Sequence, residues 1–249
     1  MPNIVIADGG YPIQQGIYEE SATQKAELGR RLQFHDGRVF RYTLNGAGSI
    51  GKGKAAISPA LVANNLDEVQ TGYTLKVGQK NVEVKLTTAP ASKTHYQDGF
   101  LLVNDGTGEG QIYKIKSHDT GDDPCKIELY DPIKTATEVT SEVSLIPNKY
   151  NGAIILNNND GAPTGVPVGI PLIDITAAYY FWAQTKGYAP ALVDTGDTIV
   201  RGNPVGKPHT HAVAGALGTV KNDGTDVVWG RVVWESAADE YALIDLCLE

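Results

Sequence analysis

Apolar and polar residues alternate in short runs over most of the chain after residue 70. In Val82–Leu86 and Ile112–Lys116 every second side chain is apolar, which is the period of a half-buried β-strand. Phe100–Val103 is apolar throughout and indicates a buried strand. Further strands are predicted over residues 126–130, 142–146, 154–156, 179–183, 198–200, 227–229, 231–234 and 241–248. Turn-forming residues separate these runs, so the sequence predicts an all-β fold with a β-sandwich or barrel body and few or no long helices.

The first 70 residues have a different pattern. Arg38–Leu44 alternates like a strand, and Ile4–Ile6 could be a short strand, whereas residues 21–28 could form a turn of helix with a thin apolar stripe. The rest is polar or glycine-rich and cannot bury much surface by itself. We expect an extended N-terminal arm packed on neighbouring subunits, with a disordered tail as the alternative. The predicted division is therefore an arm and glycine-rich segment over 1–70, a β domain over 71–149, and a C-terminal barrel-like domain over 150–249.

Charge and composition narrow the functional classes. The chain has 249 residues and a net charge of −8, which disfavours direct binding to the phosphate backbone of nucleic acids. Its apolar runs are shorter than the roughly 18 residues that span a bilayer, and its first residues lack the basic and apolar regions of a signal peptide. We therefore expect a protein made in a cytoplasm without nucleic-acid or membrane partners. Cys125 and Cys247 are expected to be ordinary lone thiols, although a disulfide between them is possible.

Two glycine-rich segments resemble nucleotide-binding loops but lack essential parts. Gly46–Gly53 nearly matches the phosphate-binding pattern, but glycine replaces the hydroxyl residue after Lys52, and Pro59 would soon stop a helix. Gly106–Gly110 is followed by a strand pattern instead of the helix that a dinucleotide fold needs. We interpret the first as a flexible loop and the second as a hairpin turn.

No residue set predicts a cofactor, a metal or catalysis. His209 and His211 could lie on one side of a strand, but no third ligand has a fixed spacing, so a solvated loop is favoured. The acidic residues 119–123 lack the period of a calcium loop and indicate a surface turn. Because no nucleophile or acid–base signature is present, we expect that the protein is not an enzyme.

The most aromatic stretch of the chain comprises Tyr179, Tyr180, Phe181 and Trp182. Consecutive residues of a strand point to opposite faces, and one small sheet buries only one face in its own core. The other face must then be covered by another subunit or by another part of the chain, such as residues 72–147. We predict that these four residues form a subunit interface. The tryptophans Trp182, Trp229 and Trp234 are expected in the core or an interface, with a sugar-stacking surface as the alternative.

Several stretches resemble capsid decoration (cement) proteins of tailed bacteriophages. The similar segments, each a strand-and-turn pattern, are 37–42, 99–110, 148–152, 180–187, 228–231 and 240–246. In addition, the C-terminal part, from Gly196–Gly206 to the end, looks like small trimeric decoration domains, in which a G-D-x-V-x-x-G-x-P-V pattern precedes a glycine-rich turn and a closing strand. The N-terminal half departs from those small domains, which leaves the mode of attachment open.

This resemblance implies a structural virion protein on the capsid exterior. Its partners would be the major capsid protein and further copies of itself, as a homotrimer, and no catalytic residue is implied. Two alternatives from other classes remain: a carbohydrate- or receptor-binding module of a phage fibre or tail, and a polysaccharide hydrolase with two carboxylates about 5 to 10 Å apart.

Overall fold

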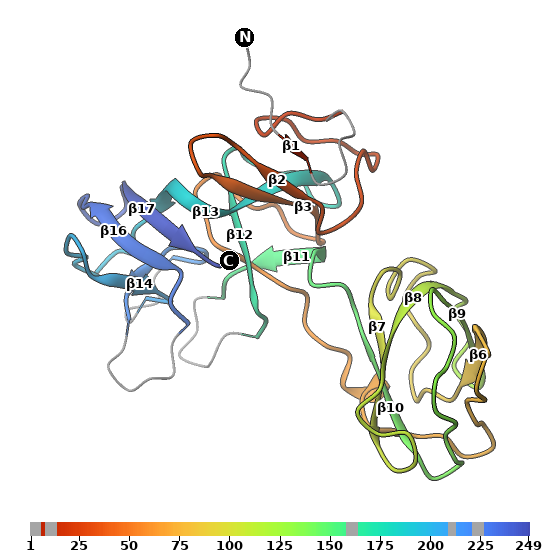
Figure 1. The fold of residues 1–249 in the computed structure, drawn as a ribbon. Coiled ribbons are helices and arrows are strands. Elements are labelled where there is room, and N and C mark those ends of the chain that lie inside the picture. The colour runs from red at the N-terminus through yellow and green to blue at the C-terminus, as the bar shows by residue number, and fades with distance from the viewer. Residues whose placement is uncertain (1–5, 8–13, 158–163, 209–212, 221–226) are drawn as a thin grey trace. The chain divides into compact units, whose positions relative to one another are not determined.

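The computed structural model describes residues 6–7, 14–157, 164–208, 213–220 and 227–249. The chain forms two compact units (Figure 1). Unit 1 contains residues 1–59 and 149–249, and unit 2 contains residues 60–148. Both are built from β-strands, and the helix in the described residues is one 3-10 turn, η1 (Ala63–Asn65). The prediction of an all-β protein is confirmed.

Unit 1 contains an eleven-stranded sheet in the order β1-β2-β3-β11-β4-β12-β13-β17-β16-β14-β15. An additional pairing of β3 with β13 closes β3, β11, β4, β12 and β13 into a ring, so this part is a small barrel. The strands are β1 (Ile6–Ala7), β2 (Arg31–Gln33), β3 (Val39–Asn45), β4 (Ala56–Ile57), β11 (Asn151–Ile155), β12 (Pro167–Pro171), β13 (Tyr180–Leu192), β14 (Pro204–Gly206), β15 (Gly218–Thr219), β16 (Gly230–Trp234) and β17 (Tyr241–Cys247).

Three hydrophobic clusters stabilise unit 1. One is formed by side chains of the ring strands, among them Phe181, Ala153 and Val168. A second lies on the other side of β3 and β13 and contains Tyr42 and Trp182. The third packs under the C-terminal strands and has fifteen buried members: Ala55, Ile57, Leu156, Ile170, Ala189, Ala191, Val193, Ile199, Val205, Leu217, Trp229, Val232, Ala242, Ile244 and Leu246. The alternation of β13 explains why it contributes to more than one cluster.

Unit 2 is a six-stranded antiparallel sheet in the order β5-β10-β7-β8-β9-β6 around one hydrophobic core. Its strands are β5 (Glu68–Val69), β6 (Asn81–Val84), β7 (Phe100–Asp105), β8 (Ile112–His118), β9 (Cys125–Leu129) and β10 (Glu142–Ile146). The alternating runs of the sequence thus form the strands predicted for residues 82–146. The two cysteines are free, Cys125 in unit 2 and Cys247 in unit 1.

The structure divides the chain differently from the sequence-based boundaries at 70/71 and 149/150. Unit 2 begins at residue 60, and residues 1–59 belong to the same unit as residues 149–249. The described part of the predicted arm packs on its own chain, because β3 pairs with β13 over Tyr180–Lys186. The residues before 14 lie outside the described part, apart from the two residues of β1, which pair with β2.

Some local predictions are wrong. Residues 21–28 contain bends and turns instead of a helical turn, and residues 198–200 and 227–229 are irregular instead of strands. In each case two or three apolar residues are too few to distinguish a regular element from a loop. The strand predicted at 179–183 is longer than expected and runs to Leu192.

The loops that resembled ligand sites are turns. The segment after Gly53 leads to the short strand β4, and Gly106–Gly110 connects the hairpin of β7 and β8. Gly106 and Gly110 both have positive φ, a conformation that favours glycine. In the acidic turn, the carboxylate of Asp119 accepts hydrogen bonds from the amides of Gly121 and Lys126. His209 and His211 lie outside the described residues.

Candidate functional site

The predicted interface residues lie inside unit 1. Phe181 and Trp182 are only 1% and 2% exposed. The ring of Trp182 contacts that of Tyr42 at 5.0 Å between centroids, and its Nε1–H donates to the carbonyl oxygen of Gln15 (2.9 Å). Both faces of this part of β13 are therefore covered by the chain itself.

The N-terminal segment around Gln15 covers the face of β13 that carries Trp182. Neither a second copy of the chain nor residues 72–147 is needed to cover it. Gln15 is buried, accepts from the hydroxyl of Tyr42 (2.8 Å) and donates to the carbonyl of Tyr180 (2.9 Å). The backbone of Tyr180 also pairs with that of Ser21. Tyr179 and Tyr180 are half-buried. The argument for an interface over Tyr179–Trp182, that one face needed an external partner, does not apply.

A different aromatic surface is exposed on the C-terminal strands of unit 1. Pro190 on β13, Leu243 on β17 and Trp234 on β16 are neighbours across the sheet. Tyr188 and Tyr241 lie two residues from Pro190 and Leu243 on the same face. Trp234 is 59% exposed, Tyr188 57% and Tyr241 42%. We call these five residues the aromatic face.

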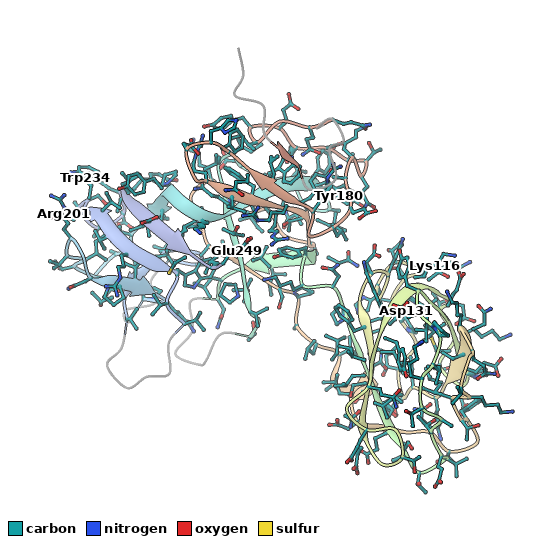
Figure 2. All side chains as sticks on the ribbon, in the orientation of Figure 1. Lys116, Asp131, Tyr180, Arg201, Trp234 and Glu249 are labelled. Carbon is teal, nitrogen blue, oxygen red and sulfur yellow. The ribbon has the colours of Figure 1, made fainter. Side chains whose placement is uncertain are left out.

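The opposite side of the same strands is buried, which shows that the aromatic face is the outer one. Ala189, Ile244 and Val232 alternate with the exposed residues and belong to the hydrophobic core. Figure 2 shows Trp234 at the periphery of unit 1, away from the β3–β13 region around Tyr180. Exposed apolar side chains gathered on one face are typical of a protein-binding surface.

Glycine and a register shift shape the aromatic face. The ring of Tyr241 lies against Gly53, where a side chain would collide with it, and its hydroxyl donates to the carbonyl of Lys52 (3.3 Å). The register of β16 on β17 shifts between Val232 and Trp234, and such a bulge redirects a side chain. The glycine-rich loop Gly46–Gly53, which was predicted to be a flexible loop, thus supports Tyr241.

A polar groove of about 450 Å³ adjoins the aromatic face. It is lined by the side chains of Asp36, Arg38, Lys186, Tyr188 and Asp245 and by two glycines. Partial burial would raise the pKa of Asp36, but hydrogen bonds from the amide and guanidinium of Arg38 outweigh it and hold that pKa below its usual value. Asp36 therefore carries a negative charge at neutral pH.

A second hollow, of about 700 Å³, lies in unit 2 beside β6, β8 and β9. Many of its lining residues are polar, among them Glu128, which forms an ion pair with Lys116 outside the hollow (2.7 Å). His118, which is buried, contributes to the wall. The described residues contain no group of three or more side chains that could hold a metal ion.

Two buried acidic residues lie at the start of the segment that resembles decoration domains, Asp194 just before it and Asp197 within it. Asp194 is fully buried and accepts from the amide of Val213 (2.7 Å), and Asp197 accepts from the hydroxyl of Thr219 (3.2 Å). Gly218 packs so closely on the carboxylate of Asp197 that a side chain would overlap it. These contacts hold the glycine-rich turn to the end of β13, which indicates a structural role.

The sequence did not reveal the aromatic face. Trp234 was considered only together with Trp182 and Trp229, both of which are buried. The alternation of exposed and buried residues in Tyr241–Cys247 is the sequence feature that could have indicated this face. Tyr241, Leu243 and Asp245 lie on one side of the strand, and the three residues between and after them lie on the other. Only the cross-strand register shows that Tyr188 and Trp234 join this face.

Comparisons with protein-family models, curated proteins and solved structures found no match. Within the described residues, no helix has the length and apolar character needed to cross a bilayer.

Proposed function

We propose that this chain is a structural virion protein that binds the outer surface of a tailed-phage capsid and stabilises the lattice of the major capsid protein. The observation that carries the proposal is the aromatic face. A sheet that buries one side in its core and exposes Trp234 and Tyr188 on the other is suited to a flat protein partner. The resemblance of residues 196–206 to decoration domains supports the choice of a capsid as that partner.

To stabilise a capsid lattice, a protein needs a stably folded body and a surface that binds the assembled shell. A protein that binds only the assembled shell shifts the equilibrium towards assembly, and many copies act together. Three hydrophobic clusters make unit 1 rigid. On this proposal the protein acts without catalysis or a cofactor, and its partners are the capsid and its own copies.

The proposal includes a homotrimer on the shell, as the resemblance implies. Rotation about a three-fold axis gives a closed assembly that decorates a lattice without forming filaments. The proposal does not assign the trimer contact to Tyr179–Trp182, because Phe181 and Trp182 are covered within the protomer. Light scattering of the protein in solution and after detachment from capsids would measure the oligomeric state, and a monomer in both would contradict the trimer.

Cosedimentation with undecorated capsids tests the proposed function. The wild-type chain should bind saturably, and Trp234→Asp should bind at least tenfold more weakly, because a charge would be placed in the apolar centre of the contact. Val77→Asp is the matched control, since Val77 is also exposed (65%) but lies in unit 2. Equal binding of wild type and Trp234→Asp would contradict attachment through the aromatic face, and no binding by wild type would contradict the function.

A carbohydrate- or receptor-binding module of a phage fibre is the second candidate. The favouring observation is the groove beside Tyr188, where an exposed ring lies next to Asp245 and Lys186. Rings that stack on sugars and charged groups that bind hydroxyls are common in such modules. Binding of oligosaccharides that is lost in Tyr188→Ala, together with a handful of copies per virion, would favour this candidate.

A further inference from the structure

A buried histidine in unit 2 holds a loop in place through both of its ring nitrogens. His118, at the end of β8, is 6% exposed. Its Nε2 lies 3.0 Å from the backbone nitrogen of Tyr96, which can only donate. Nε2 must therefore accept, and Nδ1 carries the proton that bonds the carbonyl of Asp119 (2.6 Å). The native contacts fix the neutral ring in one tautomer.

The loop that His118 holds is residues 88–98, between β6 and β7. Tyr96 is fully buried, and its hydroxyl accepts from the side-chain amide of Asn65 (2.7 Å). The carbonyl oxygen of that same side chain accepts from the amide of Thr88 (3.3 Å). His95 packs edge-on against the ring of Tyr96, at 4.5 Å between centroids. Tyr96 thus connects the loop both to β8 and to the η1 turn.

We propose that residues 88–98 are a latch that opens when His118 takes up a proton in mildly acidic solution. A protonated ring has a donor at both nitrogens, so Nε2–H would face the N–H of Tyr96 and the hydrogen bond would be lost. The charge would also be buried beside an apolar core. The latch can relieve both by swinging Tyr96 out, while the sheet keeps its own hydrogen bonds.

Burial dominates the electrostatic environment of His118. Burial lowers the pKa of His118 below its ordinary value of 6.5, although the carbonyl and charge of Asp119 oppose this. Burial and the nearby His118 also lower the pKa of His95. The carboxylate of Asp119 is already engaged by the amides of Gly121 and Lys126, and Cys125 faces it from β9 with a pKa raised to about 12 by burial. Cys125 is therefore neutral and does not stabilise an imidazolium.

The lowered pKa of His118 makes the closed latch less stable in acid. In the open state His118 has an ordinary pKa and binds a proton more readily than in the closed state. The closed state is therefore fully favoured above about pH 6.5 and loses stability as the pH falls below that value. His118 also lines the hollow of unit 2, so a proton reaches it without unfolding of the sheet.

Hydrogen exchange of the full chain, corrected for the intrinsic effect of pH, tests the latch. Between pH 7.5 and pH 5.0 the peptide covering residues 88–98 should lose protection at least tenfold, while peptides of β3 and β13 stay unchanged. His118→Gln, whose amide oxygen can accept from Tyr96 without titrating, should reduce the pH dependence to the part that His95 contributes. His35→Gln, at an exposed histidine of unit 1, is the control and should behave like wild type.

Titration of the His118 imidazole in the wild-type chain tests the latch without any variant. In nuclear magnetic resonance spectra of wild type, the midpoint for His118 should coincide with the midpoint for loss of protection at Tyr96. Unchanged protection at pH 5.0, or midpoints that differ by more than one pH unit, would overturn the proposal. Loss of protection throughout the chain at the same pH would also overturn it, since that is acid unfolding and not a latch.

Discussion

Two tryptophans of the same sheet have opposite environments. Trp182 on β13 is buried against Tyr42 and donates to Gln15, whereas Trp234 on β16 is 59% exposed. Stability depends on buried apolar contacts and satisfied hydrogen bonds, while attachment depends on what remains exposed. The first residue therefore belongs to the folding of unit 1 and the second to its proposed binding.

Alanine substitutions separate these roles. Trp182→Ala should lower the free energy of unfolding of unit 1 by about 3–5 kcal/mol, because it leaves a large cavity. Trp234→Ala should change that free energy by less than about 0.5 kcal/mol and weaken capsid binding. Calorimetric unfolding measures the first effect, and cosedimentation the second. Equal destabilisation by the two variants would contradict the assignment of Trp234 to the outer face.

Glu249 connects the barrel strands through charged hydrogen bonds. Its carboxylate accepts from Arg41 (2.7 and 3.1 Å), from the hydroxyl of Thr185 (2.8 Å) and from Arg31 (3.4 Å). Burial would raise its pKa, but the bonds from Arg41 and Thr185 outweigh this and hold the pKa below the ordinary 4.5. Figure 2 shows Glu249 in the middle of unit 1.

Glu249→Gln should lower the free energy of unfolding at pH 7 by about 1 kcal/mol, since the pairs are partly exposed. Because the folded pKa is lowered, the stabilisation is present above pH 4.5 and is lost as the pH falls through the folded pKa. Urea unfolding at pH 7 and pH 3 should therefore show a difference from wild type that shrinks with acid. A difference that is equal at both pH values would indicate that packing, and not charge, is responsible.

At the scale of elements, β13 organises unit 1. It pairs with β12, β17 and β3, and both faces of its N-terminal part, around Phe181 and Trp182, are covered. The cover over Trp182 comes from residues 15–34, which are largely irregular apart from β2 and contribute Ile17, Leu28 and Phe34 as well as the buried Gln15. The N-terminal segment is therefore required for the stability of the barrel.

Removal of residues 1–28 should destabilise unit 1 by several kcal/mol and expose Trp182, because the hydrogen bonds of Gln15 and the contacts of Leu28 are lost. Thermal unfolding and the tryptophan emission maximum, which should shift to the red, measure this. Unit 2 provides the internal control, since it contains none of these residues. An unchanged emission maximum and melting temperature would mean that the segment is dispensable.

The strands could be predicted from the sequence, and their long-range partners could not. The period of two in Ile112–Lys116 and Glu142–Ile146 comes from burial on one face and is a local signal. The pairing of Val39–Asn45 with β13 bridges more than a hundred residues and has no local signature. For the same reason the sequence indicates a polar arm around the buried Gln15, and it does not show that the chain itself covers Phe181 and Trp182.

At the scale of the molecule, unit 2 is an insertion in unit 1. The chain leaves unit 1 after Pro59 and returns at Lys149. The hydroxyl of Ser58 accepts from the amide of Val166, and Lys149 donates to the carbonyl of Pro167. The point where the chain leaves unit 1 and the point where it returns therefore both lie at the start of β12. Each unit has its own hydrophobic core, which is the property of a domain that folds by itself.

Replacement of residues 60–148 by a short glycine–serine linker should leave unit 1 folded, and residues 60–148 expressed alone should also fold. Calorimetry of the full chain should then show two transitions at the melting temperatures of the separate units. Circular dichroism with a β signal for both fragments is the check. Aggregation of both fragments, with one transition for the full chain, would mean that the units fold only together.

The number of copies per virion tests the central claim most directly. Quantitative mass spectrometry of purified virions, with the major capsid protein as the internal reference, gives this number without any variant. A lattice-binding protein should be present in hundreds of copies, in a fixed simple ratio to the capsid protein. A handful of copies per particle, or none after purification, would contradict the account.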